Sequence, residues 1–167
     1  MTEKRKDYSR AAGAGALGAR LRRLSERFDR ETAQIYAAQG IYFEQRWFGI
    51  LNQIVLNGPM TVGEIAETLC ITHVSVSQAR RALEGAGLIQ ILEDKTDARR
   101  RPISLSSKGE GLVASLAPLW AALSESAEEL DAEAGNLVRL LDRLEDALDE
   151  HTLSQRVGAR IAKSARF

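Results

Sequence analysis

The sequence predicts a mostly α-helical fold with one small β-hairpin. Only 5% of the 167 residues are aromatic, three are proline, and Ala, Leu and Arg are abundant, a composition that favours helices. Most apolar residues recur every three or four positions, which gives a helix one apolar face. Two short apolar runs flank a charged loop and indicate a pair of strands. The length fits one compact unit or a tightly built dimer.

The first 57 residues predict a flexible arm followed by two helices. Residues 1–15 are polar and then rich in Ala and Gly, so we expect a disordered or frayed arm. Residues 16–57 are predicted to form N-terminal dimerisation helices, interrupted at Gly40 and stopped by Asn57-Gly58-Pro59. Their apolar positions are Leu17, Leu21, Leu24, Phe28 and Ile35 in the first helix and Trp47, Ile50, Leu51, Ile54 and Val55 in the second.

Two short helices follow, and their spacing predicts a helix-turn-helix. Thr61 and Glu64 form a capping box that starts the first helix, which ends near Cys70. Thr72 caps the second helix, which runs to about Gly87, so the connection between them is tight. The buried side of the second helix is predicted to be Val76, Ala79 and Leu83.

A predicted hairpin completes this lobe, which spans residues 58–109. Leu88–Leu92 and Arg101–Leu105 have strand length and are joined by a charged loop without large apolar residues. A helix-turn-helix followed by a hairpin with a basic loop is typical of a winged helix. The fold class predicted is therefore mostly α with a small β-hairpin wing, a winged helix-turn-helix lobe plus a helical dimerisation region.

Residues 110–167 are predicted to be C-terminal dimerisation helices. Ser106 or Ser107 starts a long helix that contains Pro118, which we expect to bend it. A second helix, from about Ala132 to Glu150, has a leucine seam, and a Thr152–Gln155 capping box starts a short final helix. A small winged lobe cannot bury all of the apolar surface of these leucines, so the seam predicts a homodimer. Its residues are Leu137, Leu141, Leu144 and Leu148.

The charges are segregated although the formal net charge is zero. Residues 1–30 hold nine Lys or Arg and four acids, whereas Glu125–Glu150 holds ten acids and two Arg. One face can therefore attract phosphate while another faces solvent or a partner. A single cysteine and the lack of a signal peptide or a membrane-length apolar run favour the cytoplasm and no membrane.

Double-stranded DNA is the partner that a winged helix predicts, with the second helix in the major groove. Gln78 and the serines can read base edges, Arg81 better fits phosphate, and an arginine of the wing fits the minor groove. A solvated face, and a winged helix that binds protein instead, are the competing interpretations. The candidate DNA-binding residues are Thr72, His73, Val74, Ser75, Ser77, Gln78 and Arg81 on the helix, with Lys95, Arg99, Arg100 and Arg101 on the wing.

These residues also resemble a known family, the MarR (multiple antibiotic resistance regulator) family of bacterial winged-helix transcription factors. The resemblance is clearest over Met60–Gly109 and looser over about Leu17–Leu148. It rests on T-V-G-E-I-A-E-T-L, on V-S-V-S-Q…L-E-G-A-G-L-I, and on D-A-R-R-R-P-I-S-L-S-S-K-G, where Asp97, Arg99, Leu105, Ser106, Lys108 and Gly109 match the wing signature and Ser106 replaces the usual Thr. It implies a homodimer with intertwined terminal helices, two lobes that read a pseudo-palindrome, and often a small aromatic effector.

The effector site and Cys70 leave alternatives open. The aromatic residues where the resemblance puts the effector can equally be core, which we favour. Cys70 can be a redox sensor, but its place at a helix end favours a buried structural thiol. No nucleophile, phosphate loop or metal cluster indicates an enzyme or a cofactor. The candidate ligand residues are Tyr36, Tyr42, Phe43, Arg46 and Trp47, with Phe48 beside them.

Overall fold

The computed structural model describes residues 7–93 and 101–164, which are mostly helical. They divide into two compact units, one up to Val113 and one from Ala114 onward, and α6 crosses the boundary. In chain order the elements are α1 (Tyr8–Ala11), a 3-10 turn (Gly13–Ala16), α2 (Leu17–Ala38), α3 (Gln45–Asn57), α4 (Val62–Thr68), α5 (His73–Gly85), β1 (Ile89–Ile91), β2 (Ile103–Leu105), α6 (Ser107–Glu133), α7 (Leu137–Glu150) and α8 (Leu153–Ser164).

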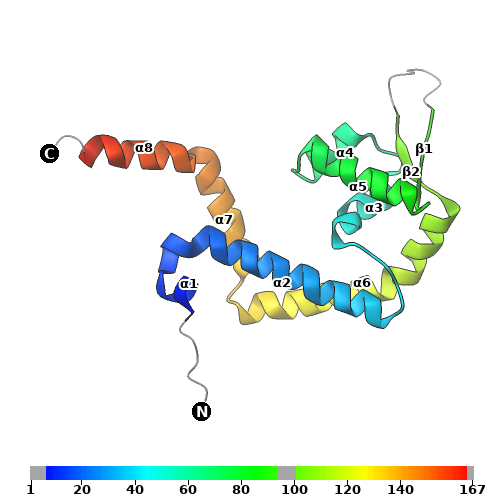
Figure 1. Cartoon of the computed structure of the whole chain (residues 1–167), viewed down its shortest axis with the longest axis horizontal. Helices are drawn as coiled ribbons and strands as arrows, with labels where there is room; N and C mark the ends of the chain where they lie inside the picture. Colours follow the sequence, from blue (N-terminus) through cyan, green and yellow to red (C-terminus); the bar gives the residue numbers. More distant parts are fainter. Residues whose placement is uncertain (1–6, 94–100, 165–167) are drawn as a thin grey trace, which may run out of the picture. The chain divides into compact units, whose positions relative to one another are not determined.

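The core of the first unit lies where α3, α4 and α5 gather beside the hairpin (Figure 1). Each of these helices turns one apolar face inward, as the spacing of its residues predicted. The winged helix-turn-helix is therefore confirmed. Its side chains with at most 4% of their surface exposed include Ile50, Leu51 and Ile54 of α3, Ile65 and Ala66 of α4, Val76, Ala79 and Leu83 of α5, and Leu88, Ile89 and Ile103 of the hairpin.

Part of the segment predicted as a flexible arm is helical. The Asp7 carboxylate accepts from the backbone amides of Ser9 and Arg10 and so caps α1. The guanidinium of Arg23 on α2 also donates to Asp7 over 3.1 Å. This hydrogen bond is the main reason that the pKa of the Asp7 carboxyl lies below its ordinary value. The prediction took the Ala/Gly-rich composition as a sign of disorder and did not include this cap.

The turn between α4 and α5 is a Schellman motif. The amide of Ile71 donates to the carbonyl of Ala66, and that of Cys70 to Glu67, which satisfies two carbonyls at the end of α4. Cys70 takes the left-handed conformation of this motif, with φ of 51°, where glycine is usual. The Cys70 thiol is exposed, so the prediction of a buried thiol is wrong. The Thr61–Glu64 capping box at the other end of α4 is confirmed.

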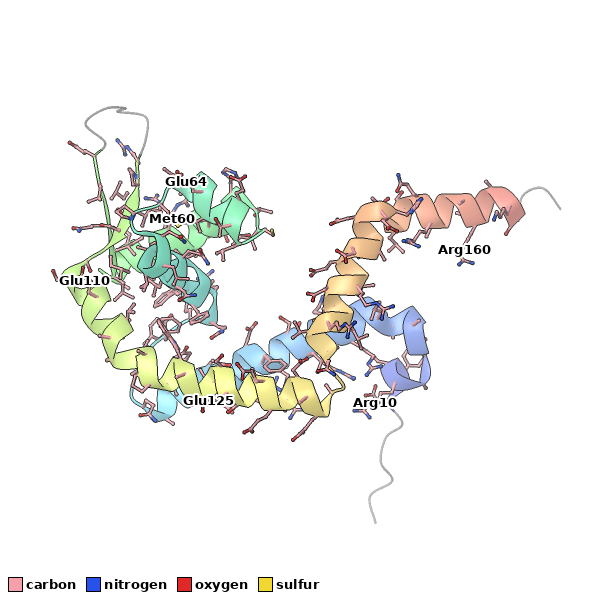
Figure 2. All side chains as sticks on the ribbon, turned by 180° about the vertical axis from the view of Figure 1, so that it is seen from behind. Arg10, Met60, Glu64, Glu110, Glu125 and Arg160 are labelled. Atoms are coloured by element: carbon pink, nitrogen blue, oxygen red, sulfur yellow. The ribbon has the colours of Figure 1, made fainter. Side chains whose placement is uncertain are left out.

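The hairpin is anchored by a third chain segment. Gln90 pairs with Ser104 at its centre, and the amide of Leu92 extends the ladder to Pro102. Met60 and Ile103 exchange two backbone hydrogen bonds of 3.1 and 2.7 Å, which ties the loop before α4 to β2. Figure 2 labels Met60 at this point. The wing is therefore joined to the helices by backbone as well as by its apolar side chains.

The second unit consists of the rest of α6 with α7 and α8, and no helix of the described residues is long and apolar enough to span a membrane. α7 begins at Leu137, so the predicted start near Ala132 is wrong. Gly135 and Asn136 both have positive φ, which no α-helix contains. Thr152 and Gln155 form the predicted capping box of α8, with hydrogen bonds of 2.8 and 3.3 Å.

Three residues at the start of α6 hold the end of α5 in place, and we call Ser106, Lys108 and Gly109 the clamp. The Lys108 Nζ donates to the carbonyl of Ala86 over 2.7 Å, and the Ser106 hydroxyl donates to that of Gly87 over 2.6 Å. The amide of Ser106 also donates to Leu88. Carbonyls that the end of a helix leaves without partners are thus satisfied by α6.

Gly109 allows the backbone of α6 to come this close. A β-carbon at Gly109 would overlap the carbonyl oxygen of Leu88 and lie 3.0 Å from its carbonyl carbon. Because both atoms belong to the backbone, a larger residue could be admitted only if α6 moved away from the end of α5.

Replacing Gly109 with alanine should lower the free energy of unfolding by at least about 2 kcal/mol, because the new methyl group overlaps backbone. Urea unfolding at one protein concentration measures this. Gly111→Ala is the matched control, because a β-carbon there meets nothing within 4 Å. It should be neutral or stabilising by up to about 1 kcal/mol. Equal effects of the two substitutions would contradict the close approach.

Cys70→Gly should raise the free energy of unfolding by about 1 kcal/mol, because glycine adopts the left-handed conformation without a steric penalty. Cys70→Ala is the control, since it removes the thiol but keeps the β-carbon. The same urea titration compares them. If both variants change stability equally, the backbone conformation at residue 70 is not the source of strain.

Candidate nucleic-acid interface

The second helix of the helix-turn-helix, α5, presents one polar face to solvent. Val76, Ala79 and Leu83 point into the core, with at most 3% of their surface exposed. Val74, Gln78 and Arg81 follow at spacings of four and three, so they share the opposite face. All three are exposed, and Val74 exposes 65% of its surface although it is apolar. This face therefore presents the methyl groups of Val74, the side-chain amide of Gln78 and the guanidinium of Arg81.

The first turn of α5 is ordered by Thr72. Its hydroxyl accepts from the amide of Ser75 over 3.1 Å and lies 2.8 Å from the Ser75 hydroxyl. Both hydroxyls are exposed but already share a hydrogen bond. His73 is exposed as well, whereas Ser77 is half-buried at the edge of the face. Val74 and Gln78 are exposed and are not engaged in this hydrogen bond of the first turn.

The next arginine along α5, Arg80, is not part of this face. It forms an ion pair with Glu84 across one turn, at 3.2 Å. Such a pair within one helix stabilises that helix modestly. Arg81 is exposed and is the arginine that shares a face with Val74 and Gln78.

The predicted wing contacts are described only in part. Arg101 is exposed just before β2. Lys95, Arg99 and Arg100 lie outside the described residues, as does Asp97. Arg101 immediately precedes Pro102, whose carbonyl accepts a hydrogen bond from the amide of Leu92 at the end of the hairpin ladder. Contacts of the wing with DNA therefore stay predictions.

The predicted ligand residues form a packed aromatic cluster. Tyr36, Phe43 and Trp47 expose at most 5% of their surface, and their rings follow one another at centroid distances of 4.7 and 5.7 Å. This packing agrees with the core interpretation. Among the described residues, however, the buried Trp47 Nε1 has no hydrogen-bond partner, and a buried donor of this kind is unfavourable.

The polar members of the ligand prediction lie at the edge of this cluster, where the Tyr42 ring contacts that of Trp47 edge-on at a centroid distance of 5.7 Å. Tyr42 and Arg46 are exposed, and both bind the carboxylate of Glu44, over 3.0 and 2.6 Å. The hydrogen bond to Glu44, together with the charge of that group, raises the pKa of the Tyr42 hydroxyl. Arg46, in the first turn of α3, thus has a carboxylate partner in Glu44, which precedes that helix. A carboxylate ligand would have to compete with Glu44 for it.

Two open pockets occur elsewhere in the lobe. One of about 640 Å³ lies between the end of α3 and α4, and its lining includes Leu56, Met60 and Glu67. The other, of about 480 Å³, lies between α3 and the hairpin and is lined by Val55 and Ser104 among others. Neither lining contains the aromatic cluster or the exposed face of α5.

The sequence analysis missed what Ser106 and Lys108 do. There they served only as matches to a family motif. The structure shows that both side chains donate hydrogen bonds to carbonyls at the end of α5 and so hold it in position. A basic residue two positions after a hydroxyl at the start of a helix was the available signal. The signal cannot be interpreted without knowing which carbonyls lie opposite.

Comparison with known proteins points to one family. Residues 43–100 match the model of the MarR family. A MarR family regulator from Neisseria meningitidis has 27% identity and a TM-score of 0.56, over 89% of this chain and 95% of that one. A comparison with curated proteins gave no match.

Two further solved structures show the same fold at lower identity. BpsR of Bordetella bronchiseptica has 21% identity and a TM-score of 0.64, over 77% of this chain and 92% of its own. MepR of S. aureus has 24% identity and a TM-score of 0.61, over 77% and 97%. The family match covers the lobe, and the chain shares its fold with these MarR family regulators along most of its length.

Proposed function

We propose that this protein is a dimeric transcriptional repressor that binds double-stranded DNA in a sequence-specific manner. The observation that carries the proposal is the exposed face of α5, where Val74, Gln78 and Arg81 stand opposite the core. A methyl group can contact thymine, an amide can pair with adenine, and a guanidinium can reach phosphate or guanine. MepR has been solved as a complex with DNA, which supports the same partner here.

Apolar surface outside the lobe supports the dimer. The stripe of α2 is 37% to 53% exposed and consists of Leu17, Leu21, Leu24, Phe28 and Ile35. α7 exposes between 38% and 58% of Leu137, Val138, Leu140 and Leu148. Stripes of this size on a monomer indicate a protein interface. A two-fold dimer would cover them and place two α5 helices on half-sites about one DNA turn apart.

Repression is the mode of control that we infer for such a dimer. A protein that occupies a promoter excludes polymerase from it without any further contact. In this role the protein would work in the cytoplasm, where bacterial DNA lies. The polar face of α5 would supply the sequence selectivity, and the paired lobes and wings would supply most of the affinity for DNA.

A small aromatic ligand is a second element of the proposal. BpsR is described with regulation of its DNA binding by 6-hydroxynicotinic acid. Here the buried Trp47 Nε1 without a partner favours a ligand with an acceptor atom beside the aromatic cluster. Arg46, released from Glu44, could then bind an acidic group. Ligand binding would shift the lobes away from the spacing that the DNA requires.

Arg81→Ala should weaken binding to a duplex of mixed sequence and reduce the salt dependence of the affinity. Loss of one phosphate contact lowers the slope of log affinity against log salt by about 1 per lobe. Fluorescence anisotropy over a series of salt concentrations measures both. Arg22→Ala, which removes a charge outside the lobe, is the control and should leave the slope unchanged. Binding that shows no salt dependence in the wild type would contradict the proposal and favour a protein partner.

Gln78→Ala should change the sequence selectivity of DNA binding more than its overall affinity. Duplexes recovered from a random-sequence pool by the variant should lose a preference at one base position of each half-site, by about tenfold, the effect of losing one amide-to-base pair. Gln39→Ala, in the exposed end of α2, is the control and should recover the same sequences as the wild type. Identical sequences from all three proteins would show that Gln78 reads no base.

A further inference from the structure

The pocket between α3 and the hairpin, which we call the hairpin pocket, has a volume of about 480 Å³ and walls from three parts of the lobe. The end of α3 contributes Val55, the hairpin contributes Leu92 and Ser104, and the first turn of α6 contributes Glu110, which Figure 2 labels. Most of the lining side chains are aliphatic. Proteins bind small molecules in pockets of this size and lining, where a few polar groups fix the orientation of the ligand.

Three polar side chains of the hairpin pocket are incompletely satisfied. The Ser104 Oγ is buried and has no hydrogen-bond partner among the described residues, which is unfavourable for a hydroxyl. Gln90 pairs with Ser104 across the two strands, so their side chains lie side by side. The Gln90 Nε2 donates to the carbonyl of Leu105 over 3.3 Å, which leaves its amide oxygen as an acceptor. Glu110 is exposed and belongs to no ion pair within the described ranges.

The charge of the hairpin pocket selects a cation. Glu110 is the charged residue of its described lining, and no Lys or Arg of that lining balances it. A primary ammonium group donates three hydrogen bonds and accepts none. Glu110, Gln90 and Ser104 offer three acceptors for such a group. The Ser104 Oγ is covered by its neighbours, of which Gln90 is exposed and can turn aside.

Most polar side chains of the larger pocket, between α3 and α4, are already used by the lobe itself. Asn57 donates to the side chain of Gln53 over 2.9 Å, and the carboxylate of Glu64 accepts from the amide of Thr61 over 2.7 Å. The Thr68 hydroxyl donates to the carbonyl of Glu64. The hairpin pocket is therefore the better site for a ligand that brings several donors.

We propose that the hairpin pocket binds a small primary amine with an apolar body. The ammonium group hydrogen-bonds to Glu110 and Gln90, and the body packs on the aliphatic side chains of α3 and the hairpin. The hairpin pocket shares no lining residue with the aromatic cluster or with the exposed face of α5. The inference therefore does not rest on the proposed function.

An amine in this position would join the wing to the helices. The lining of the hairpin pocket belongs to α3, both strands and α6, so one ligand touches all four elements. The amide of Leu92 donates to Pro102 and that of Ile103 donates to Met60. Both amides should exchange with solvent more slowly when the amine is bound, because opening of the hairpin then requires its release. This readout needs no DNA.

Phenylpropylamine is the probe, and an NMR titration of the isotope-labelled full chain measures its affinity and its place of binding. Amide signals of the hairpin pocket should shift in a saturable manner, with a dissociation constant of about 1 mM or lower. Phenylpropanol has the same body without the charge, so it should bind at least about tenfold more weakly. Glu110→Gln should weaken the binding of the amine by about tenfold, since a hydrogen bond to a charged group is lost. Glu67→Gln, which neutralises a carboxylate of the larger pocket, is the control and should bind as the wild type does.

A matched pair of substitutions on α3 tests the location. Val55 and Leu56 are both exposed, but Val55 lines the hairpin pocket whereas Leu56 lines the larger one. Val55→Arg should weaken the binding of the amine at least about tenfold, because a guanidinium repels the ammonium group and can pair with Glu110. Leu56→Arg should leave the affinity unchanged. Equal binding of amine and alcohol, equal loss in both arginine variants, or no saturable shift would each overturn the proposal, as would unchanged amide exchange at saturation.

Discussion

The close contact between the start of α6 and the end of α5 is the constraint on which the lobe depends. Gly109 lets the two backbones approach, and Ser106 and Lys108 supply donors to carbonyls that a helix end leaves open. The same contact begins the long helix that leads into the second unit. A residue of ordinary size at Gly109 would therefore disturb the direction of α5 and the root of the wing together.

Recognition and association rest on different parts of the chain. The lobe buries its apolar residues within itself and leaves a small polar face on α5. The helices outside it do the reverse, because α2, α7 and α8 leave apolar stripes exposed. The first arrangement suits a partner that is read by hydrogen bonds, and the second suits a partner that excludes water. The proposed dimer would use both, with selectivity from α5 and affinity from the pairing of lobes.

What could be predicted from the sequence follows from how local each signal is. The capping boxes at Thr61 and Thr152 involve residues three positions apart, so the letters alone revealed them. The buried face of α5 followed from helical spacing. Two other contacts join residues about 20 to 40 positions apart, so no local sequence pattern predicts them. They are the strand pairing of Met60 with Ile103 and the hydrogen bonds of the clamp. The exposure of Cys70 was missed because its apolar neighbours suggested burial, whereas a Schellman turn points the residue outward.

The central claim is that the exposed face of α5 lies in a DNA groove. A photoreactive amino acid in place of Val74 tests it most directly, with the same group in place of Ala162 on α8 as the control. In the presence of a bound duplex, irradiation should join position 74 to a base, whereas position 162 should yield no DNA adduct. Protein adducts alone at position 74, with DNA present and bound, would contradict the account.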